Sequence, residues 1–138
     1  MGHIGPGVRS KLIADSDVSG LVGTRIRPDK LAQKETLPAI VYSELNTEHD
    51  QGIAGPVGSR LTRLAVGCFD DSRLGANALA EKVRLAIDGE TGTFGSETVD
   101  ACVLEDSDQQ DIQPDDGSDV GQYVTTLVFL ISLQETTS

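Results

Sequence analysis

The sequence predicts one α+β domain over residues 1–138, with a mainly antiparallel β-sheet of about four strands and helices packed on one face. The length suits a single hydrophobic core. The hydrophobic and charged fractions, 38% and 24%, are typical of a globular chain. Helical and alternating hydrophobic patterns also follow each other in the order helix, strand, long loop, strand, helix, strand, loop, strand.

The N-terminal part predicts two short helical segments and then an extended one. Residues 8–14 are helix formers with apolar side chains on one face. A second helical turn is expected over residues 16–22, capped by Ser16 or Asp17 and stopped by the glycine that follows. Residues 24–28 should be extended, because the proline at their end disfavours the helical conformation in the residue before it.

Two strands are predicted on either side of a polar loop. Leu37–Leu45 is the first strand, in which Pro38 is tolerated only at the start or on an edge. Residues 46–59 contain three glycines and a proline, so we expect a long loop there. Arg60–Phe69 is the next strand, with one apolar face made by Leu64, Val66 and Cys68.

The clearest helix prediction covers Ser72–Asp88. Asp71 or Ser72 provides the N-cap, and Gly89 ends the helix. The apolar side chains that recur at helical spacing are Ala76, Leu79, Ala80, Val83, Ala86 and Ile87. This spacing predicts a helix packed on the sheet.

The last part of the chain predicts a strand, an acidic loop and a long final strand. The first strand spans Glu97–Leu104, and the loop spans residues 105–121. Gln122–Gln134 is the final strand, and it carries apolar residues on both faces. Such a strand is usually central in its sheet or covered by a partner subunit.

Charge is distributed unevenly along the chain, whose formal net charge is -11. Residues 1–34 carry six basic and three acidic side chains, whereas residues 105–138 carry eight acidic side chains and no basic one. Because phosphate binding requires clustered lysines and arginines, a chain this acidic is a poor candidate for wrapping DNA.

The residues that usually carry catalysis form no recognisable site. His3 and His49 have no metal-ligand partner at helical spacing, and Cys68 and Cys102 are interpreted as reduced core residues. Two glycine-containing segments, Gly55-Pro56-Val57-Gly58 and Gly89-Glu90-Thr91-Gly92, lack the Gly-Lys-Ser/Thr ending of a phosphate loop. We therefore expect no enzyme, no metal and no cofactor. No apolar run is long enough to cross a bilayer, and no signal peptide is recognisable, so we expect folding in the cytoplasm and no membrane contact.

The acidic cluster of the predicted loop has three interpretations, and its members are Glu105, Asp106, Asp108, Asp111, Asp115, Asp116 and Asp119. It is a solvated loop, a Ca²⁺ site built from oxygen ligands, or an acidic surface that repels DNA. Its spacing does not fit the twelve-residue EF-hand loop.

Three stretches of the sequence form a recognisable pattern: Leu21-Val22-Gly23-Thr24-Arg25-Ile26, Leu37-Pro38-Ala39-Ile40-Val41-Tyr42 and Arg63-Leu64-Ala65-Val66-Gly67-Cys68-Phe69. Together they resemble a family of phage tail completion, or tail terminator, proteins. The resemblance continues into the helix that ends before Gly89 and covers roughly residues 8–89. The chain departs from the family pattern at Arg27, Gly67 and Phe69.

The resemblance implies a structural virion protein of a tailed phage, assembled in the host cytoplasm. Its subunits would form a hexameric ring that caps the tail tube, stops tube polymerisation and docks the head connector or stopper protein. The partners would be copies of itself, the tail tube protein and the connector, while DNA passes through without specific binding. Closed rings use two different patches of each subunit, and the oppositely charged ends of this chain would supply such a pair.

Two groups of residues follow as candidates for these contacts. We expect the loop at 46–59 to touch the tube and the acidic loop to face the channel. Arg25, Leu37 and Pro38 are interpreted as structural, with Arg25 pairing with a carboxylate inside the fold or at the subunit seam. The interface candidates are Arg25, Arg27, His49, Asp50, Gln51, Arg60 and Arg63. The channel candidates are Asp111, Asp115, Asp116 and Asp119.

Other functions remain open at this point. A head-completion or stopper protein belongs to the same apparatus, and a gene transfer agent would use the chain in the same role. A small cytoplasmic ligand-binding module is the alternative from a different class. It predicts a monomer or dimer that a metabolite stabilises.

Overall fold

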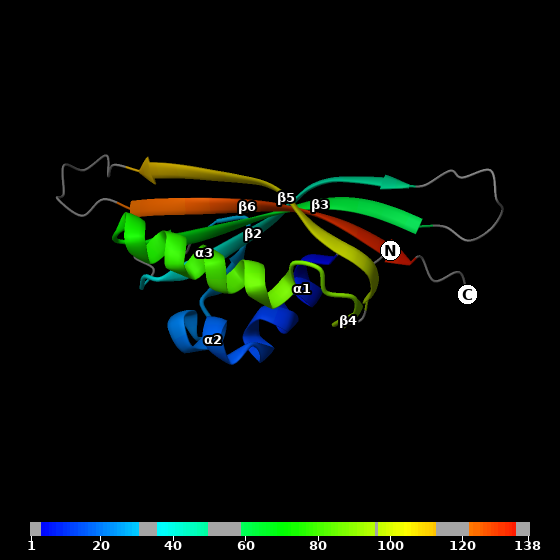
Figure 1. Ribbon diagram of the computed structural model, residues 1–138, viewed down its shortest axis with the longest axis horizontal. Coiled ribbons are helices and arrows are strands. Elements are labelled where there is room, and N and C mark those ends of the chain that lie inside the picture. Colours follow the sequence, from blue (N-terminus) through cyan, green and yellow to red (C-terminus); the bar gives the residue numbers. More distant parts are fainter. Residues whose placement is uncertain (1–3, 31–35, 50–58, 96, 113–121, 135–138) are drawn as a thin grey trace.

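A computed structural model describes residues 4–30, 36–49, 59–95, 97–112 and 122–134. Within them, three helices lie against one face of a six-stranded sheet (Figure 1), which confirms the α+β class. The helices are α1 (Ile4–Ala14), α2 (Ser16–Val22) and α3 (Arg73–Ile87). The strands are β1 (Ile26–Pro28), β2 (Ala39–His49), β3 (Ser59–Asp70), β4 (Gly92–Phe94), β5 (Glu97–Ile112) and β6 (Gln122–Gln134).

The strand order is β1-β2-β3-β6-β5-β4. Each of the four long strands is antiparallel to the long strand beside it, and the four correspond to those that the sequence predicts. The sequence prediction missed β4, and it described β1 only as extended; each is three residues long, and they extend the sheet at its two edges. β1 runs parallel to β2. β6 lies between β3 and β5, so the central position predicted for it is confirmed.

The helix predictions differ from the structure mainly at the N-terminus. α1 begins at Ile4, whose backbone N–H donates to the Glu44 carboxylate at 2.7 Å. Pro6 is tolerated in the first turn because the N–H groups there have no partner within the helix. Asp15, not Ser16 or Asp17, caps α2. α3 agrees with its prediction to within one residue at each end, and Ser72 is its N-cap.

The hydrophobic core lies between the helices and the sheet. The alternation predicted for β3 is confirmed, because Leu64, Val66 and Cys68 all point into this core with no exposed area. β6 contributes Phe129 and Ile131, which are equally buried. Burying each such apolar side chain contributes about 1.5–3 kcal/mol, so this layer accounts for much of the fold's stability.

Both long loops predicted from the sequence are too long. Residues 46–49 belong to β2, and residues 105–112 belong to β5, where they pair with β6 as far as Ile112 opposite Gln122. Glu105 to Gln110 are exposed. Their carboxylates therefore stay hydrated while the backbone completes the ladder, and strand formation carries no charge-burial penalty. Residues 50–58 and 113–121 lie outside the described residues.

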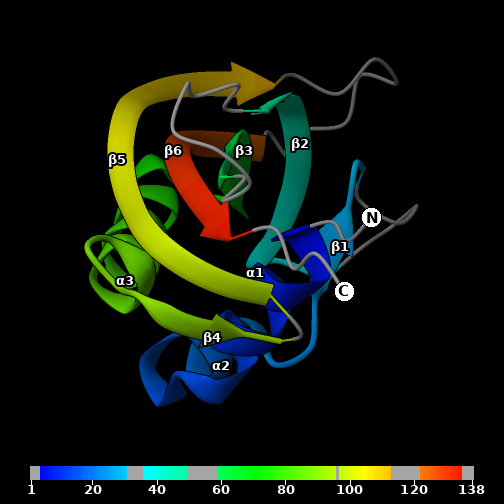
Figure 2. The same cartoon turned by 90° about the vertical axis from the view of Figure 1, so that its right-hand side faces the viewer.

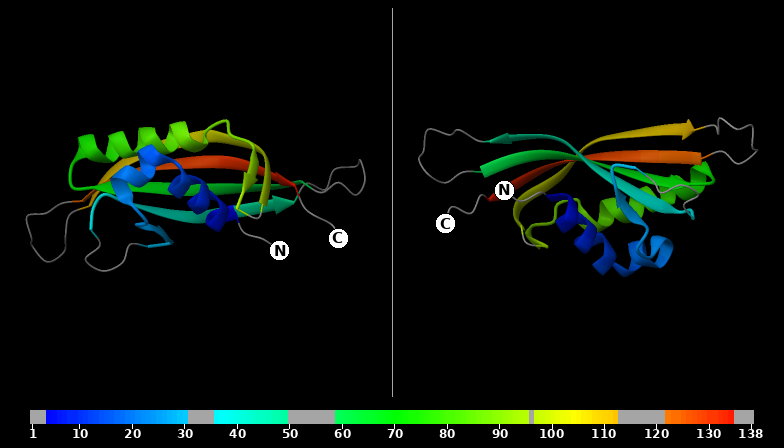
Figure 3. Two further views of the ribbon diagram at one scale, coloured as in Figure 1. Left: turned by 90° about the horizontal axis from the view of Figure 1, so that it is seen from below. Right: turned by 180° about the vertical axis from the view of Figure 1, so that it is seen from behind.

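The two long hairpins extend from opposite ends of the molecule. β2 ends and β3 begins on one side of the molecule, whereas β5 ends and β6 begins on the other (Figures 1 and 3). Seen along its length, the sheet is strongly curled, and β5 bends around its outer side (Figure 2). Two bulges interrupt the pairing of β5 with β6, one of them between Leu104 and Asp106.

Candidate functional site: the open face of the sheet

The sheet face turned away from the helices, called here the open face, is the candidate assembly surface. Side chains alternate between the two faces of a strand. On β6 the buried Phe129 faces the helices, so Val128 and Leu130 lie on the open face, where both are half-buried. The apolar character that the sequence predicts for both faces of β6 is therefore confirmed.

The centre of the open face is apolar and hollowed. Val41 of β2, Ala65 of β3 and Val124 of β6 line a hollow of about 220 Å³. Gly67 also lines it, and a Cβ atom added there would lie 3.0 Å from the Phe69 ring. The glycine therefore lets that ring lie across the floor of the hollow.

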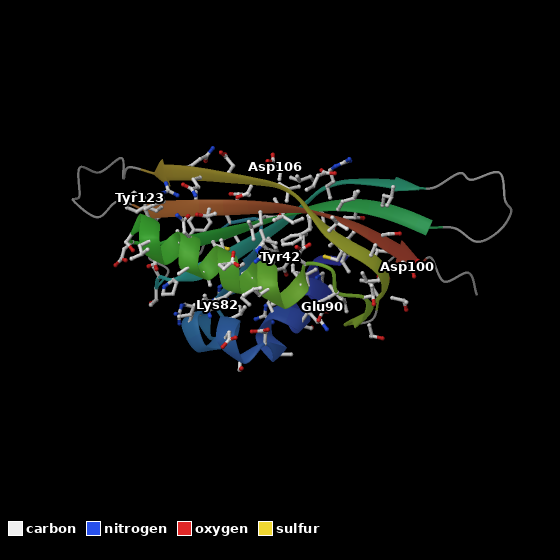
Figure 4. The ribbon with its side chains drawn as sticks, in the orientation of Figure 1. Tyr42, Lys82, Glu90, Asp100, Asp106 and Tyr123 are labelled. Atoms are coloured by element: carbon white, nitrogen blue, oxygen red, sulfur yellow. The ribbon has the colours of Figure 1, made fainter. Side chains whose placement is uncertain are left out.

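Acidic side chains of β5 form one border of the open face. Asp106 is opposite Val128 and Asp108 is opposite Thr126, so both carboxylates share the face of these β6 residues. Figure 4 shows Asp106 on the side of the sheet away from the helices, whereas Lys82 lies on α3. Both aspartates are exposed.

An ion pair crosses this face. The Arg63 Nε atom of β3 donates to Glu105 Oε1 of β5 at 2.8 Å, which spans the intervening β6. Leu130 is opposite both Arg63 and Val103, so the ion pair lies beside an apolar row. Val103 is 53% exposed, which leaves apolar surface in contact with solvent at this position.

Part of the β5 backbone edge also lacks a neighbouring strand. β4 pairs only with Glu97–Val99. Two backbone groups in the next stretch of β5 already have hydrogen-bond partners. Cys102 O accepts from Gly89 N–H, and Leu104 N–H donates to Asp88 Oδ1. Within the described part of the chain, no strand lies along the outer edge of β5 beyond Leu104. Unpaired edges of this kind are sites of chain association unless charges protect them.

The opposite edge of the sheet is basic. Arg9 of α1 donates to the carbonyl oxygens of Ile26, at 3.0 Å, and Thr24, at 3.3 Å. Arg25 donates to the carbonyls of Pro38 and Leu21. The partners of Arg25 shown here are thus backbone carbonyls, and the predicted pairing with a carboxylate, inside the fold or at the subunit seam, stays a prediction. Arg25 ties the end of α2 to the start of β2.

The other candidate residues lie in three different places. Arg27 is opposite Val41, and it therefore lies on the open face at the β1 edge. His49 and Arg60 are opposite each other where β2 and β3 end. Asp111 lies in β5 opposite Tyr123, not in a loop as predicted. Five candidates lie outside the described residues: Asp50, Gln51, Asp115, Asp116 and Asp119.

Asp106 and Asp108 belong to the acidic cluster that the sequence predicts to lie in a loop facing the channel. The structure instead places both in β5, on the open face. The sequence does not predict this strand, because aspartate is depleted in strands.

The two cysteines lie in the core, as predicted. Burial raises the pKa of the Cys68 thiol far above its usual range. Burial, with smaller contributions from Asp88 and Glu90, raises the pKa of Cys102 to about 12. Across the described ranges, no group of three or more His, Cys, Asp or Glu side chains is placed to hold a metal ion. Nor does any helix there have the length and apolarity to span a membrane.

Comparisons with known proteins agree with this architecture. A chain from the "virion of native gene transfer agent (GTA) particle" has the same fold, with a TM-score of 0.66 over 93% of this chain and 92% of that chain, at 15% sequence identity. No curated protein matches the sequence. The model of the family "Tail completion protein gp17" matches residues 6–120, which is most of the chain. The chain therefore belongs to the tail completion protein gp17 family and is a structural protein of a phage tail.

Proposed function

We propose that this protein is a tail terminator, which closes as a ring on the end of the tail tube, stops tube polymerisation and gives the head connector a surface to dock on. Membership of the tail completion family supports this role. The observation that carries it is the apolar open face, where Val128 and Leu130 are only half-buried and Val103 is mostly exposed. Contiguous apolar surface of this kind marks an interaction site. The ring number of six is an expectation from the family resemblance.

The placement of the two hairpins suits a subunit with contacts at both ends. We assign the end where β2 and β3 meet, with His49 and Arg60, to the tail tube. Deleting residues 50–57 should leave a folded protein that no longer caps tails. Normal capping by that deletion would remove this end from the interface.

The acidic end, where β5 and β6 meet, is assigned to the channel. Asp111 belongs to β5, and Asp115, Asp116 and Asp119 follow it in the sequence. A lumen lined by carboxylates offers no cations to replace the counterions of DNA, so DNA passes without sticking.

Electron microscopy of a lysate in which this gene alone is silenced tests the role. We expect overlong or irregular free tails beside filled heads without tails. Tails of normal length that fail to attach would instead indicate a head-completion or stopper protein, and intact infectious particles would refute both. A control lysate that expresses the gene from a plasmid should contain complete virions.

A further inference from the structure

One transverse row of the open face runs from a basic edge of the sheet to an acidic edge. Arg27 of β1 is opposite Val41, Val41 is opposite Gly67, and the row continues through Thr126 to Asp108 of β5. Five adjacent strands at the usual spacing place its ends roughly 19 Å apart along the sheet. A cationic and an anionic side chain therefore lie at opposite borders of one apolar face.

Neighbouring residues strengthen both ends of this row. On the acidic side, the β5 segment from residue 105 to 112 has four carboxylates and no basic residue, and of these Glu105 already pairs with Arg63. On the basic side, the segment from α1 to Lys30 has five basic and three acidic residues, and Lys30 is exposed. Arg9 and Arg25 donate to backbone carbonyls, and neither pairs with a carboxylate among the described residues. Their positive charge therefore stays available to an incoming anionic surface.

The charges also determine which copies can meet. Two β5 edges repel each other, which opposes a symmetric dimer through this strand. The β1 edge cannot continue the β-ladder, because the Ile26 carbonyl accepts from Arg9 and Pro28 has no N–H. Contact between unlike edges therefore relies on side chains. Contact between two different patches gives a head-to-tail arrangement when no two-fold axis relates the copies, and that arrangement closes into a ring when the rotation allows it.

We propose that successive copies of this chain associate head-to-tail, with Asp106 and Asp108 on the open face of one copy set against Arg27 and Lys30 at the β1 edge of the next. The half-buried Val128 and Leu130 beside these aspartates are covered in that contact. The proposal rests on the proposed ring and names the surfaces that form its seam.

Reversing the charge of each edge separately tests the contact. The first variant combines Asp106→Lys and Asp108→Lys, and the second combines Arg27→Glu and Lys30→Glu. Sedimentation equilibrium of purified protein, up to the highest soluble concentration, measures self-association without any tail tube. Each variant alone should associate at least about 100-fold more weakly than the wild type, because like charges would face each other across the seam.

Mixing restores the attraction if the two altered edges meet each other, and assemblies larger than a dimer show that the contact is head-to-tail. An equimolar mixture should recover assemblies in which the two variants alternate in a 1:1 ratio, which native mass spectrometry resolves. The chain carrying all four substitutions should self-associate like the wild type. Asp71→Lys with Glu90→Lys is the matched control, because it changes the net charge equally at exposed positions outside the two proposed contact surfaces. That control should assemble normally, and thermal unfolding checks that every variant is folded.

Several results would overturn the proposal. A wild type that stays monomeric, folded variants that assemble like the wild type, or a mixture that fails to recover assembly would each do so. The terminator role is tested separately, by adding the assembled protein to uncapped tails. Normal assembly without capping would refute the terminator role and leave the seam intact.

Discussion

The alternation of β6 makes a quantitative prediction about which of its faces stabilises the isolated subunit. Phe129 has no exposed area and packs against the helices, so Phe129→Ala removes a whole buried ring and leaves a cavity. Such substitutions lower the free energy of unfolding by about 3–5 kcal/mol. Leu130, the next residue, is half-buried on the open face, and Leu130→Ala should lower it by only about 1 kcal/mol.

Thermal unfolding followed by circular dichroism at low protein concentration measures this difference. For a domain of this size, each kcal/mol shifts the Tm by roughly 3–5 °C. Phe129→Ala should therefore lower the Tm by roughly 9–25 °C and Leu130→Ala by roughly 3–5 °C. Val128→Ala, on the same face as Leu130, is the matched control and should resemble it. Equal losses on both faces would mean that the open face is covered within the subunit, which would refute its assignment as an interface.

Three further predictions concern the helices, the core thiols and the channel. Gly7→Ala should destabilise the fold by about 1–3 kcal/mol in denaturant unfolding, because the new Cβ would lie 2.2 Å from the Phe94 carbonyl oxygen. Gly20→Ala should instead stabilise α2 by up to about 1 kcal/mol, because no atom lies within 4 Å of the new Cβ. A larger loss of stability in Gly20→Ala than in Gly7→Ala would contradict the packing of α1 on β4. Cys68 and Cys102 should resist alkylation at pH 8 in the native protein and react only on unfolding. Burial keeps both thiols protonated, and it raises the pKa of Cys102 to about 12. Rapid labelling without unfolding would show that the core opens. Replacing the channel acids Asp115, Asp116 and Asp119 with asparagine should slow DNA ejection from virions. Unchanged ejection kinetics would mean that these residues do not face the channel.

The elements that could be predicted from the sequence are those with long, regular hydrophobic patterns. β6 has the predicted bounds, and α3 differs by one residue at each end, because alternation in the strand and helical spacing in the helix are both sustained over more than ten residues. β4 is too short to produce a pattern, and three residues of ladder form there only because the chain after α3 returns to β5.

The acidic half of β5 shows why composition can mislead. Aspartate is unfavourable in strands mainly when its side chain must be buried, and residues 105–110 keep theirs in water while β6 provides the backbone partners. The pairing depends on residues more than ten positions away in the sequence, which local propensity does not include.

The candidate site was predictable in its chemistry but not in its geometry. The opposite charges of the two ends of the chain are visible in the sequence, as is the second apolar face of β6. Their relation depends on the strand order, which places β1 and the acidic part of β5 toward opposite borders of one face. Arg63 also illustrates this limit, because its partner Glu105 lies two strands away across β6.

As a tail terminator, this protein should cap the growing end of a tail. Gold-labelled protein added to uncapped tails, followed by fresh tail tube protein, tests this directly by electron microscopy. We expect label at one end of each tail and no further elongation from that end. Label spread along the tube, absence of label at either end, or continued growth past a labelled end would contradict it.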